Sequence, residues 1–314
     1  MTGPMTAGLF PGQGSQAVGM GRELAEHFPI VRDTFAQADD ILGFALTMLC
    51  FDGPVEELKR TAIAQPALLT VCTAYWRLLC EHGFSCAIVA GHSLGEYSAL
   101  VAAGALSFPE ALRLVRRRGE LMEEAAACNP GSMLAVLGAD DALVQALCTE
   151  VAAEHGVVAP ANYNAPGQVV VSGDTEAITA LRTLAKSRGV KAIPLQVSGP
   201  FHSALMQSAA ALFTKVLADV PITTPTIPIV PNVTASPTVD PDVIRDALAR
   251  QITGSVQWAR SLSAMRDTGV AQFVEIGPGN VLTGLVQRTL PDAATPSLNE
   301  WLIGSNGTLN DNIL

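Results

Sequence analysis

Short apolar runs alternate along this chain with stretches of helical periodicity, and the alternation predicts a layered α/β fold. Four apolar runs have the length and composition of buried strands: one that ends at Leu9-Phe10, then residues 86–90, 227–230 and 272–276. Helical patterns fill the segments between them, over residues 68–82, 94–103, 109–126, 202–218, 241–252, 256–268 and from 281 onward. Strands that alternate with helices in this way are typical of a mostly parallel, doubly wound sheet.

The pattern changes in the middle of the chain. Strands and helices here follow the order β-α-β-β-α-β, over residues 132–137, 139–154, 157–162, 168–172, 175–188 and 191–197, with a turn at 164–167. This order is that of the split βαβ, ferredoxin-like arrangement. We therefore expect a small domain over residues 128–197, inserted in a large domain formed by residues 1–127 and 198–290. Residues 291–314 show no clear periodicity and are expected to form a mobile C-terminal tail.

The composition excludes several classes of protein. Of the 314 residues, 49% are hydrophobic and 15% charged, so a large core is available, and the formal net charge of -10 argues against a general nucleic-acid binder. None of the six cysteines belongs to a C-x-x-C pair, which favours buried free thiols over a disulfide framework or a zinc site. No basic-then-apolar segment opens the chain, and no uninterrupted apolar run is long enough to span a bilayer. We expect a cytoplasmic protein that binds no membrane, metal or redox cofactor.

The pentapeptide Gly91-His92-Ser93-Leu94-Gly95 is the strongest chemical signal in the chain. It has the form G-x-S-x-G and lies between the apolar run at 86–90 and the helical run that follows it. This strand–turn–helix context is what a nucleophile elbow requires, because the tight turn exposes the serine hydroxyl beside the first N–H groups of a helix. Those N–H groups can stabilise an oxyanion. The sequence therefore predicts Ser93 as a catalytic nucleophile.

A serine hydroxyl is a weak nucleophile that needs a base, and the chain has five histidines. Three of them occur among charged helical residues or before a glycine at a helix end: His27, His82 and His155. His92 is next to Ser93 in the elbow, so its side chain should point away from that of the serine and play a supporting role. His202 occurs where the chain returns from the predicted insertion, a loop position suited to an active site. We predict His202 as the base, with a helix-capping histidine as the alternative.

Several further motifs occur around these residues in one order along the chain. They are Phe10-Pro11-Gly12-Gln13-Gly14-Ser15-Gln16, Gln65-Pro66-Ala67-Leu68, Gly91-His92-Ser93-Leu94-Gly95-Glu96-Tyr97, Asn162-Tyr163-Asn164-Ala165-Pro166-Gly167-Gln168, Gly199-Pro200-Phe201-His202 and Glu275-Ile276-Gly277-Pro278-Gly279. Together they resemble the malonyl-CoA:acyl carrier protein transacylase family, which is shared by fatty acid synthesis and polyketide synthase acyltransferases. The resemblance covers nearly all of residues 6–290. It implies a hydrolase-like α/β core with a ferredoxin-like small domain, in agreement with the pattern above.

The resemblance implies a role for individual residues. Ser93 matches the nucleophile that takes malonyl from coenzyme A, and His202 matches the base that activates Ser93 and later the acceptor thiol. Gln13 and Leu94 match the residues whose backbone N–H groups form the oxyanion hole, and Arg118 matches the arginine that binds the malonyl carboxylate. Gln251 matches the residue whose backbone carbonyl orients the histidine, and Gln65 and Asn162 match positions that line the pocket. Phe201 matches the bulky aromatic that goes with malonyl, because an α-methyl group would crowd its ring. The implied acceptor is the phosphopantetheine thiol of an acyl carrier protein, and no cofactor is implied.

Physical chemistry supports the predicted role of Arg118 independently of the resemblance. A desolvated carboxylate is costly unless a partner meets it, and arginine offers two parallel N–H donors that fit a carboxylate. The alternative for the run of three arginines at 116–118 is a solvated basic face of a helix.

Two other functions compete with transfer. A serine thioesterase or other hydrolase on the same core would not need Arg118, and a non-catalytic docking subunit would not need Ser93 or His202. The sequence does not separate fatty acid from polyketide biosynthesis. Five basic residues are candidates for docking a small acidic carrier protein: Arg116, Arg117, Lys186, Arg188 and Lys191. The alternative is that they are ordinary surface charges. The resemblance implies a monomer.

Overall fold

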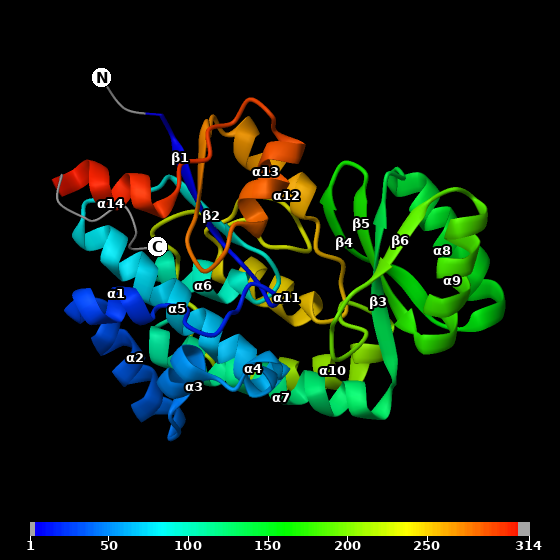
Figure 1. Ribbon diagram of the computed structural model, residues 1–314, viewed down its shortest axis with the longest axis horizontal. Coiled ribbons are helices and arrows are strands. Elements are labelled where there is room, and N and C mark those ends of the chain that lie inside the picture. The colour runs from blue at the N-terminus through cyan, green and yellow to red at the C-terminus, as the bar shows by residue number, and fades with distance from the viewer. Residues whose placement is uncertain (1–3, 307–314) are drawn as a thin grey trace.

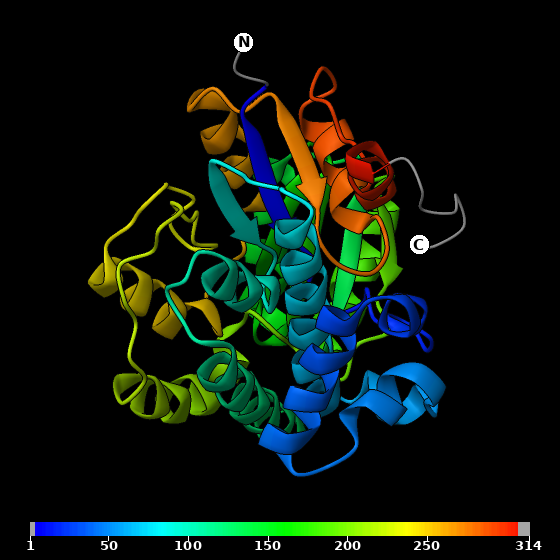
Figure 2. The same ribbon diagram turned by 90° about the vertical axis from the view of Figure 1, so that its left-hand side faces the viewer.

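The large sheet is built from strands that lie far apart in the sequence. The computed structural model describes residues 4–306 (Figure 1). In the sheet, β1 (Thr6–Phe10) lies between β2 (Ile88–Gly91) and β7 (Gln272–Glu275), and both pairings are parallel. Figure 2 shows the three strands side by side and running the same way, so their carboxyl ends meet at one edge of the sheet.

The fourth strand predicted at residues 227–230 is reduced to isolated bridges. Ile229 forms a parallel bridge with Val89 at the free edge of β2. Pro228 and Pro231 lie on either side of this contact and have no N–H group to donate, so a continuous ladder cannot form. The prediction of a full strand is therefore wrong, although the segment does run beside β2.

Helices cover both faces of this sheet. The helices on the sheet and in the layers beyond it are α1 (Arg22–His27), α2 (Pro29–Leu42), α3 (Leu46–Asp52), α4 (Val55–Lys59), α5 (Thr61–Glu81), α6 (Gly95–Ala102), α7 (Phe108–Cys128), α10 (Gln207–Ala218), α11 (Pro241–Gln251), α12 (Trp258–Asp267) and α13 (Val281–Thr289). Side chains alternate across β1, so Phe10 joins the core formed with α5, α6 and α7, while Leu9 joins the core formed with α12 and α13. The two faces are thus buried by different helices, as in other parallel sheets.

The second sheet belongs to a separate lobe, which Figure 1 shows beside the large sheet. Its strand order is β4 (Val158–Ala165), β5 (Gln168–Asp174), β3 (Gly131–Leu137) and β6 (Lys191–Pro194), and every pairing is antiparallel. Two helices, α8 (Asp141–His155) and α9 (Thr175–Ser187), pack on one face through a cluster of valine and leucine side chains. This is the ferredoxin-like arrangement that the element order predicts, and with the parallel sheet it confirms the predicted fold class.

Two strand boundaries in this lobe differ from the prediction. β4 continues through the predicted turn at 164–167 as far as Ala165, and the chain reverses at Pro166-Gly167, where Gly167 has a φ of +70°. β6 ends at Pro194 instead of continuing to residue 197. The Leu195 N–H still donates to the Met133 oxygen of β3, and residues 195–198 line the pocket described below.

The C-terminal segment is more ordered than the aperiodic tail that we expected over 291–314. Residues Leu298–Asn306 form α14, and the Trp301 ring packs edge-on against that of Phe84, with centroids 5.0 Å apart. Apolar residues at 298, 301 and 302 have helical spacing, which is too short a run to stand out in the sequence. Residues 307–314 lie outside the described part of the chain. Within residues 4–306, no helix combines the length and apolar character needed to cross a membrane.

Candidate active site

A sharp turn at the carboxyl end of β2 presents Ser93. Its backbone has a φ of +50°, a left-handed conformation that costs a non-glycine residue about 1–3 kcal/mol. The flanking glycines permit the turn: a Cβ on Gly91 would lie 1.9 Å from the carbonyl of Gly95, and one on Gly95 would lie 2.0 Å from the oxygen of Phe10. The strand, the turn and α6 therefore have the geometry of a nucleophile elbow.

The Asn232 side chain stabilises this turn through two hydrogen bonds to its backbone. Its Oδ1 accepts a hydrogen bond from the Ser93 N–H at 2.6 Å, and its Nδ2 donates to the Gly91 oxygen at 2.6 Å. Asn232 is fully buried, and its role was not predicted from the sequence. The signal available was its position, because a polar residue that follows an apolar run in an α/β protein often lies at the carboxyl edge of the sheet.

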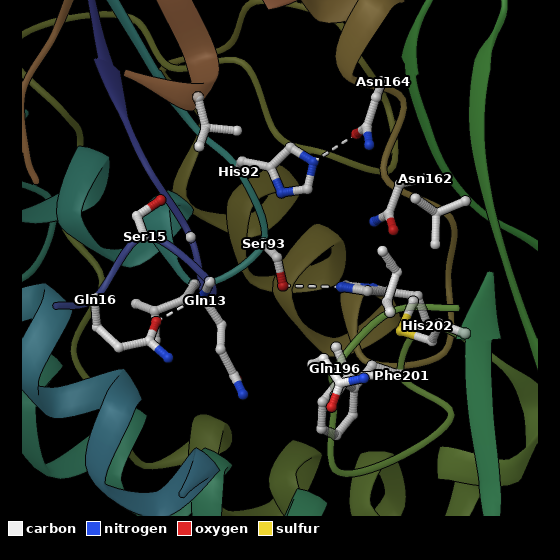
Figure 3. A pocket seen from close by; sticks show the side chains of 18 of the residues that line it. Gln13, Ser15, Gln16, His92, Ser93, Asn162, Asn164, Gln196, Phe201 and His202 are labelled. Atoms are coloured by element: carbon white, nitrogen blue, oxygen red, sulfur yellow. Dashed lines mark hydrogen bonds between the residues drawn. The ribbon is translucent and has the colours of Figure 1, made fainter. Parts of the chain in front are cut away.

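His202 faces the serine from the opposite side of the cleft. Its Nε2 lies 2.8 Å from Ser93 Oγ (Figure 3). Its Nδ1 lies 2.9 Å from the backbone oxygen of Gln251 and 3.1 Å from that of Gly254. Since backbone carbonyls only accept hydrogen bonds, the ring proton belongs on Nδ1 and Nε2 is free to accept the serine proton. Burial and, to a smaller extent, the nearby Arg118 charge lower the pKa of His202 to about 3. The imidazole is therefore neutral at physiological pH.

The backbone around His202 differs from the predicted helix over 202–218. His202 has a φ of +56°, which a helix does not allow, and it is followed by a 3₁₀ turn at Ala204–Met206. The α-helix, α10, begins at Gln207. The left-handed residue aims the imidazole back at the elbow.

Arg118 lies beneath Ser93 and is only 1% exposed. Its Nη1 donates to Gln65 Oε1 at 2.9 Å, and its Nη2 donates to Gln251 Oε1 at 3.0 Å and lies 3.3 Å from Ser93 Oγ. The Tyr97 ring lies 5.4 Å from the guanidinium carbon. No carboxylate within residues 4–306 forms an ion pair with Arg118. A buried cation next to a nucleophile is thus available to an anionic group of a ligand.

The helical stripe of α7 explains why one of three consecutive arginines is buried. The buried positions of α7 recur with helical spacing: Leu114, Val115, Arg118, Leu121 and Met122. Arg116 and Arg117 fall off this stripe and both pair with Glu120 on the outer surface. The capping box between Ser107 and Glu110 fixes the start of the helix.

Gln251 connects the three groups. Its backbone carbonyl accepts from His202, and its Oε1 accepts from Arg118. Its Nε2 donates to the backbone oxygen of Ser93 at 3.0 Å and to Glu96 Oε2 at 2.7 Å. Only the backbone contact of Gln251 was predicted from the sequence. The side-chain contacts join segments more than 130 residues apart in sequence, and no local pattern announces them.

Gln13 and Leu94 line the same cavity as Ser93, and Leu94 directly follows the nucleophile in the chain. The loop after β1 touches the turn closely, because a Cβ on Gly12 would lie 2.4 Å from the His92 oxygen. Neither the Gln13 nor the Leu94 backbone N–H group donates to another group in the described part of the chain. Two free N–H donors beside a nucleophile can serve an oxyanion.

A cavity of about 520 Å³ opens onto these groups between the two lobes. Figure 3 shows Asn162 and Asn164 on one side of Ser93, with Gln196 and Phe201 on the other. Phe201, which is 6% exposed, precedes the histidine and lines the cavity.

His92 points away from the Ser93 hydroxyl, as the sequence analysis expected. Its Nε2 lies 2.8 Å from Asn164 Oδ1 (Figure 3), and its ring lies 5.4 Å from that of Trp258. Burial lowers the pKa of His92, so the ring is neutral and connects the elbow to β4.

The remaining basic candidates lie outside the cavity lining. Arg188 pairs with Glu150, whereas Lys186 and Lys191 are exposed and form no ion pair among the described residues. No group of three or more histidine, cysteine or acidic side chains suited to a metal occurs within residues 4–306.

Residues 9–306 match the family model of the acyl transferase domain. The chain is 47% identical over 294 residues to the malonyl CoA-acyl carrier protein transacylase of Escherichia coli O157:H7, with 93% of this chain and 95% of that protein covered. The fold is similar to that of an acyl carrier protein S-malonyltransferase from Vibrio cholerae, with 44% identity, a TM-score of 0.90, and 93% and 96% of the two chains covered. It is also similar to a chain of PlMCAT:AntF (holo), a type II PKS acyl-carrier protein in complex with its malonyl-transacylase. There the identity is 42%, the TM-score 0.93 and the coverage 97% and 100%.

Proposed function

This chain belongs to the acyl transferase family, and we propose that it moves malonyl from coenzyme A to the phosphopantetheine thiol of an acyl carrier protein. The observation that carries the proposal is the fully buried Arg118, which lies 3.3 Å from the Ser93 hydroxyl and forms no ion pair among the described residues. A cation held there favours an acyl group that ends in a carboxylate.

In the first half-reaction, the Ser93 hydroxyl attacks the thioester carbonyl while His202 Nε2 takes the serine proton. The oxygen of the carbonyl becomes an oxyanion, which the N–H groups of Gln13 and Leu94 stabilise. Coenzyme A then leaves as a thiol with the proton from His202, and malonyl stays on Ser93 as an ester. The Gln251 carbonyl holds the imidazole in place of an acidic third residue.

In the second half-reaction, the carrier thiol attacks the malonyl-serine ester and His202 takes the thiol proton. When the ester breaks, the proton returns to the Ser93 oxygen, which restores the free enzyme. A covalent intermediate between two substrates gives ping-pong kinetics.

The buried arginine disfavours the competing hydrolase function. A thioesterase for uncharged acyl groups would bury a guanidinium that no group of its substrate meets, so the desolvation cost would bring no gain in substrate binding. The names of the relatives agree, since each is a transacylase or a malonyltransferase.

The low pKa of His202 predicts an activity that is insensitive to mild acid. Because the imidazole stays neutral down to about pH 3, kcat/KM for coenzyme A release from malonyl-CoA should not fall between about pH 7 and pH 5. A base with the ordinary histidine pKa of about 6.5 would lose roughly 25-fold over this range. Stopped-flow measurement of thiol release, with circular dichroism at each pH as a folding control, checks the expectation. A fall centred near pH 6.5 in folded protein would contradict it.

The function itself is tested by offering malonyl-CoA, methylmalonyl-CoA and acetyl-CoA, each with several carrier proteins. We expect malonyl to be transferred fastest, because acetyl lacks the carboxylate and methylmalonyl crowds the Phe201 ring. In the same assay, Phe201→Val should raise the methylmalonyl-to-malonyl ratio by about 5- to 150-fold, which corresponds to about 1–3 kcal/mol for one methyl group. Equal transfer of all three groups by the unaltered protein would contradict the proposed function. An unchanged ratio in the variant would contradict only the role of Phe201.

The partner that we propose is an acidic carrier protein from fatty acid or polyketide biosynthesis. We propose that this chain binds it as a monomer. Exposed Lys186 and Lys191 are the better docking candidates, because they have no ion pair among the described residues. Arg116, Arg117 and Arg188 already pair with glutamates.

A further inference from the structure

Glu96 is a buried carboxylate that the transfer chemistry above does not use. It lies in the first turn of α6, three residues after the nucleophile, and is 1% exposed. Its Oε2 accepts hydrogen bonds from the Asn232 N–H at 3.0 Å and from Gln251 Nε2 at 2.7 Å. Its Oε1 has no hydrogen-bond partner among the described residues. A single unpaired oxygen at this depth needs an explanation.

The Gln251 amide connects this carboxylate to Arg118. The guanidinium donates to the amide oxygen at 3.0 Å, and the amide nitrogen donates to Glu96 at 2.7 Å. One side of the amide faces a cation and the other faces an anion, so the two charges are coupled without touching.

The other groups around Glu96 carry no charge at neutral pH. Tyr97 on the same helix is a phenol whose pKa burial raises further, and His202 is neutral. Asn232 and Gln251 contribute only hydrogen bonds. Arg118 on α7 is the one charged group that acts on the pKa of Glu96, and Glu96 is the one carboxylate that acts on that of Arg118, among the described residues.

We propose that Glu96 is the counter-charge of Arg118 in the free protein, and that it takes up a proton when the carboxylate of a malonyl group pairs with Arg118. This inference rests on the proposed function. One proton from solvent adds to one carboxylate oxygen of Glu96, and no other bond forms or breaks. Glu96 acts through Gln251 and Arg118 without touching the substrate, so it is a positioning residue.

The physical reason is that one guanidinium cannot offset two buried carboxylates. Like charges that share a dry site raise the pKa of one of the pair. Burial already raises the pKa of Glu96 to about 7, although the hydrogen bonds from Asn232 and Gln251 and the charge of Arg118 act in the opposite direction. A malonyl carboxylate paired with Arg118 offsets the positive charge that lowers the pKa of Glu96, and its own negative charge repels the Glu96 carboxylate. Both effects raise the pKa of Glu96 further. An acetyl group has neither effect, so it should bind without proton uptake.

The test measures proton uptake directly. The Ser93→Ala variant binds acyl-CoA without transfer, and isothermal titration at about pH 8 in two buffers of different ionisation enthalpy counts the protons taken up. We expect malonyl-CoA to bind with uptake of more than about half a proton per site, and acetyl-CoA with none. The dissociation constant for malonyl-CoA should weaken about tenfold between about pH 7 and pH 8.5, because a group whose pKa rises on binding favours the complex at low pH.

Two variants in the same background separate this role from a structural one. Glu96→Gln keeps the shape and one acceptor oxygen, and it should abolish the uptake and flatten the pH dependence. Glu275→Gln is the matched control: this other buried carboxylate accepts from the Leu282 and Thr283 N–H groups, burial also raises its pKa, and neither Arg118 nor Gln251 acts on that pKa. It should leave the uptake unchanged.

The outcomes distinguish two failures. Binding of malonyl-CoA without uptake, or uptake that persists in Glu96→Gln, would overturn the role of Glu96 and leave the proposed function standing. Failure of malonyl-CoA to bind while acetyl-CoA does would overturn both.

Discussion

Ser93→Ala is expected to abolish the covalent intermediate and to slow malonyl transfer by roughly 10⁴- to 10⁶-fold. No other hydroxyl has a neutral imidazole at 2.8 Å and two free backbone N–H groups beside it in the described part of the chain. His202→Ala should cost about as much, because the serine and the histidine act as one unit. The double variant Ser93→Ala/His202→Ala should therefore be no slower than either single variant. Transfer rates of the three proteins to one carrier protein check this expectation.

Ser98→Ala is the matched control for this prediction. Ser98 is a buried serine on α6, the helix that follows the Ser93 turn, and it does not line the cavity. We expect its transfer rate to stay within a few-fold of that of the unaltered protein. If the losses of the two single variants multiply in the double variant, the two residues act independently, and the proposed serine–histidine unit is wrong.

Arg118→Ala is expected to lower malonyl transfer by about 30- to 1000-fold, which corresponds to about 2–4 kcal/mol for a charge-assisted pair. Acetyl transfer, which needs no carboxylate partner, should change much less, so the ratio of the two rates is the diagnostic quantity. Arg118→Ala also leaves the Gln65 and Gln251 side-chain oxygens without their donor, which should lower the free energy of unfolding by about 1–3 kcal/mol each. A loss of folded protein lowers both transfer rates equally, so it cancels in their ratio.

Arg118→Lys tests whether geometry matters in addition to charge. An ammonium keeps the positive charge but cannot donate along two parallel directions as the guanidinium does. We expect Arg118→Lys to recover part of the malonyl preference, with a rate between those of Arg118→Ala and the unaltered protein. Equal losses for malonyl and acetyl in both variants would contradict the assignment of the carboxylate to Arg118.

The parts of the site that the sequence reveals are those encoded within a few residues. The elbow needs glycines at 91 and 95 beside an apolar run, and this requirement is visible as a string. The choice of Arg118 over its neighbours came from the family resemblance, although the apolar stripe of α7 leads to the same choice.

The parts that the sequence hides depend on contacts between distant segments. Glu96, Asn232 and the Gln251 side chain form one hydrogen-bonded group with contacts that span more than 130 residues of sequence. Each of them looks like an ordinary surface residue in a window of ten positions. The short bridge at Ile229 and the left-handed backbone of His202 were also missed, because proline placement and a positive φ override the hydrophobic pattern.

The central claim is that Ser93 carries malonyl as an ester and that Arg118 favours this acyl group. Intact mass measurement after brief incubation with malonyl-CoA or acetyl-CoA, without carrier protein, tests it most directly. We expect one malonyl group on the unaltered protein, none on Ser93→Ala, and a malonyl-to-acetyl ratio that collapses in Arg118→Ala. Equal malonylation of the unaltered protein and Ser93→Ala, or a ratio unchanged in Arg118→Ala, would contradict it.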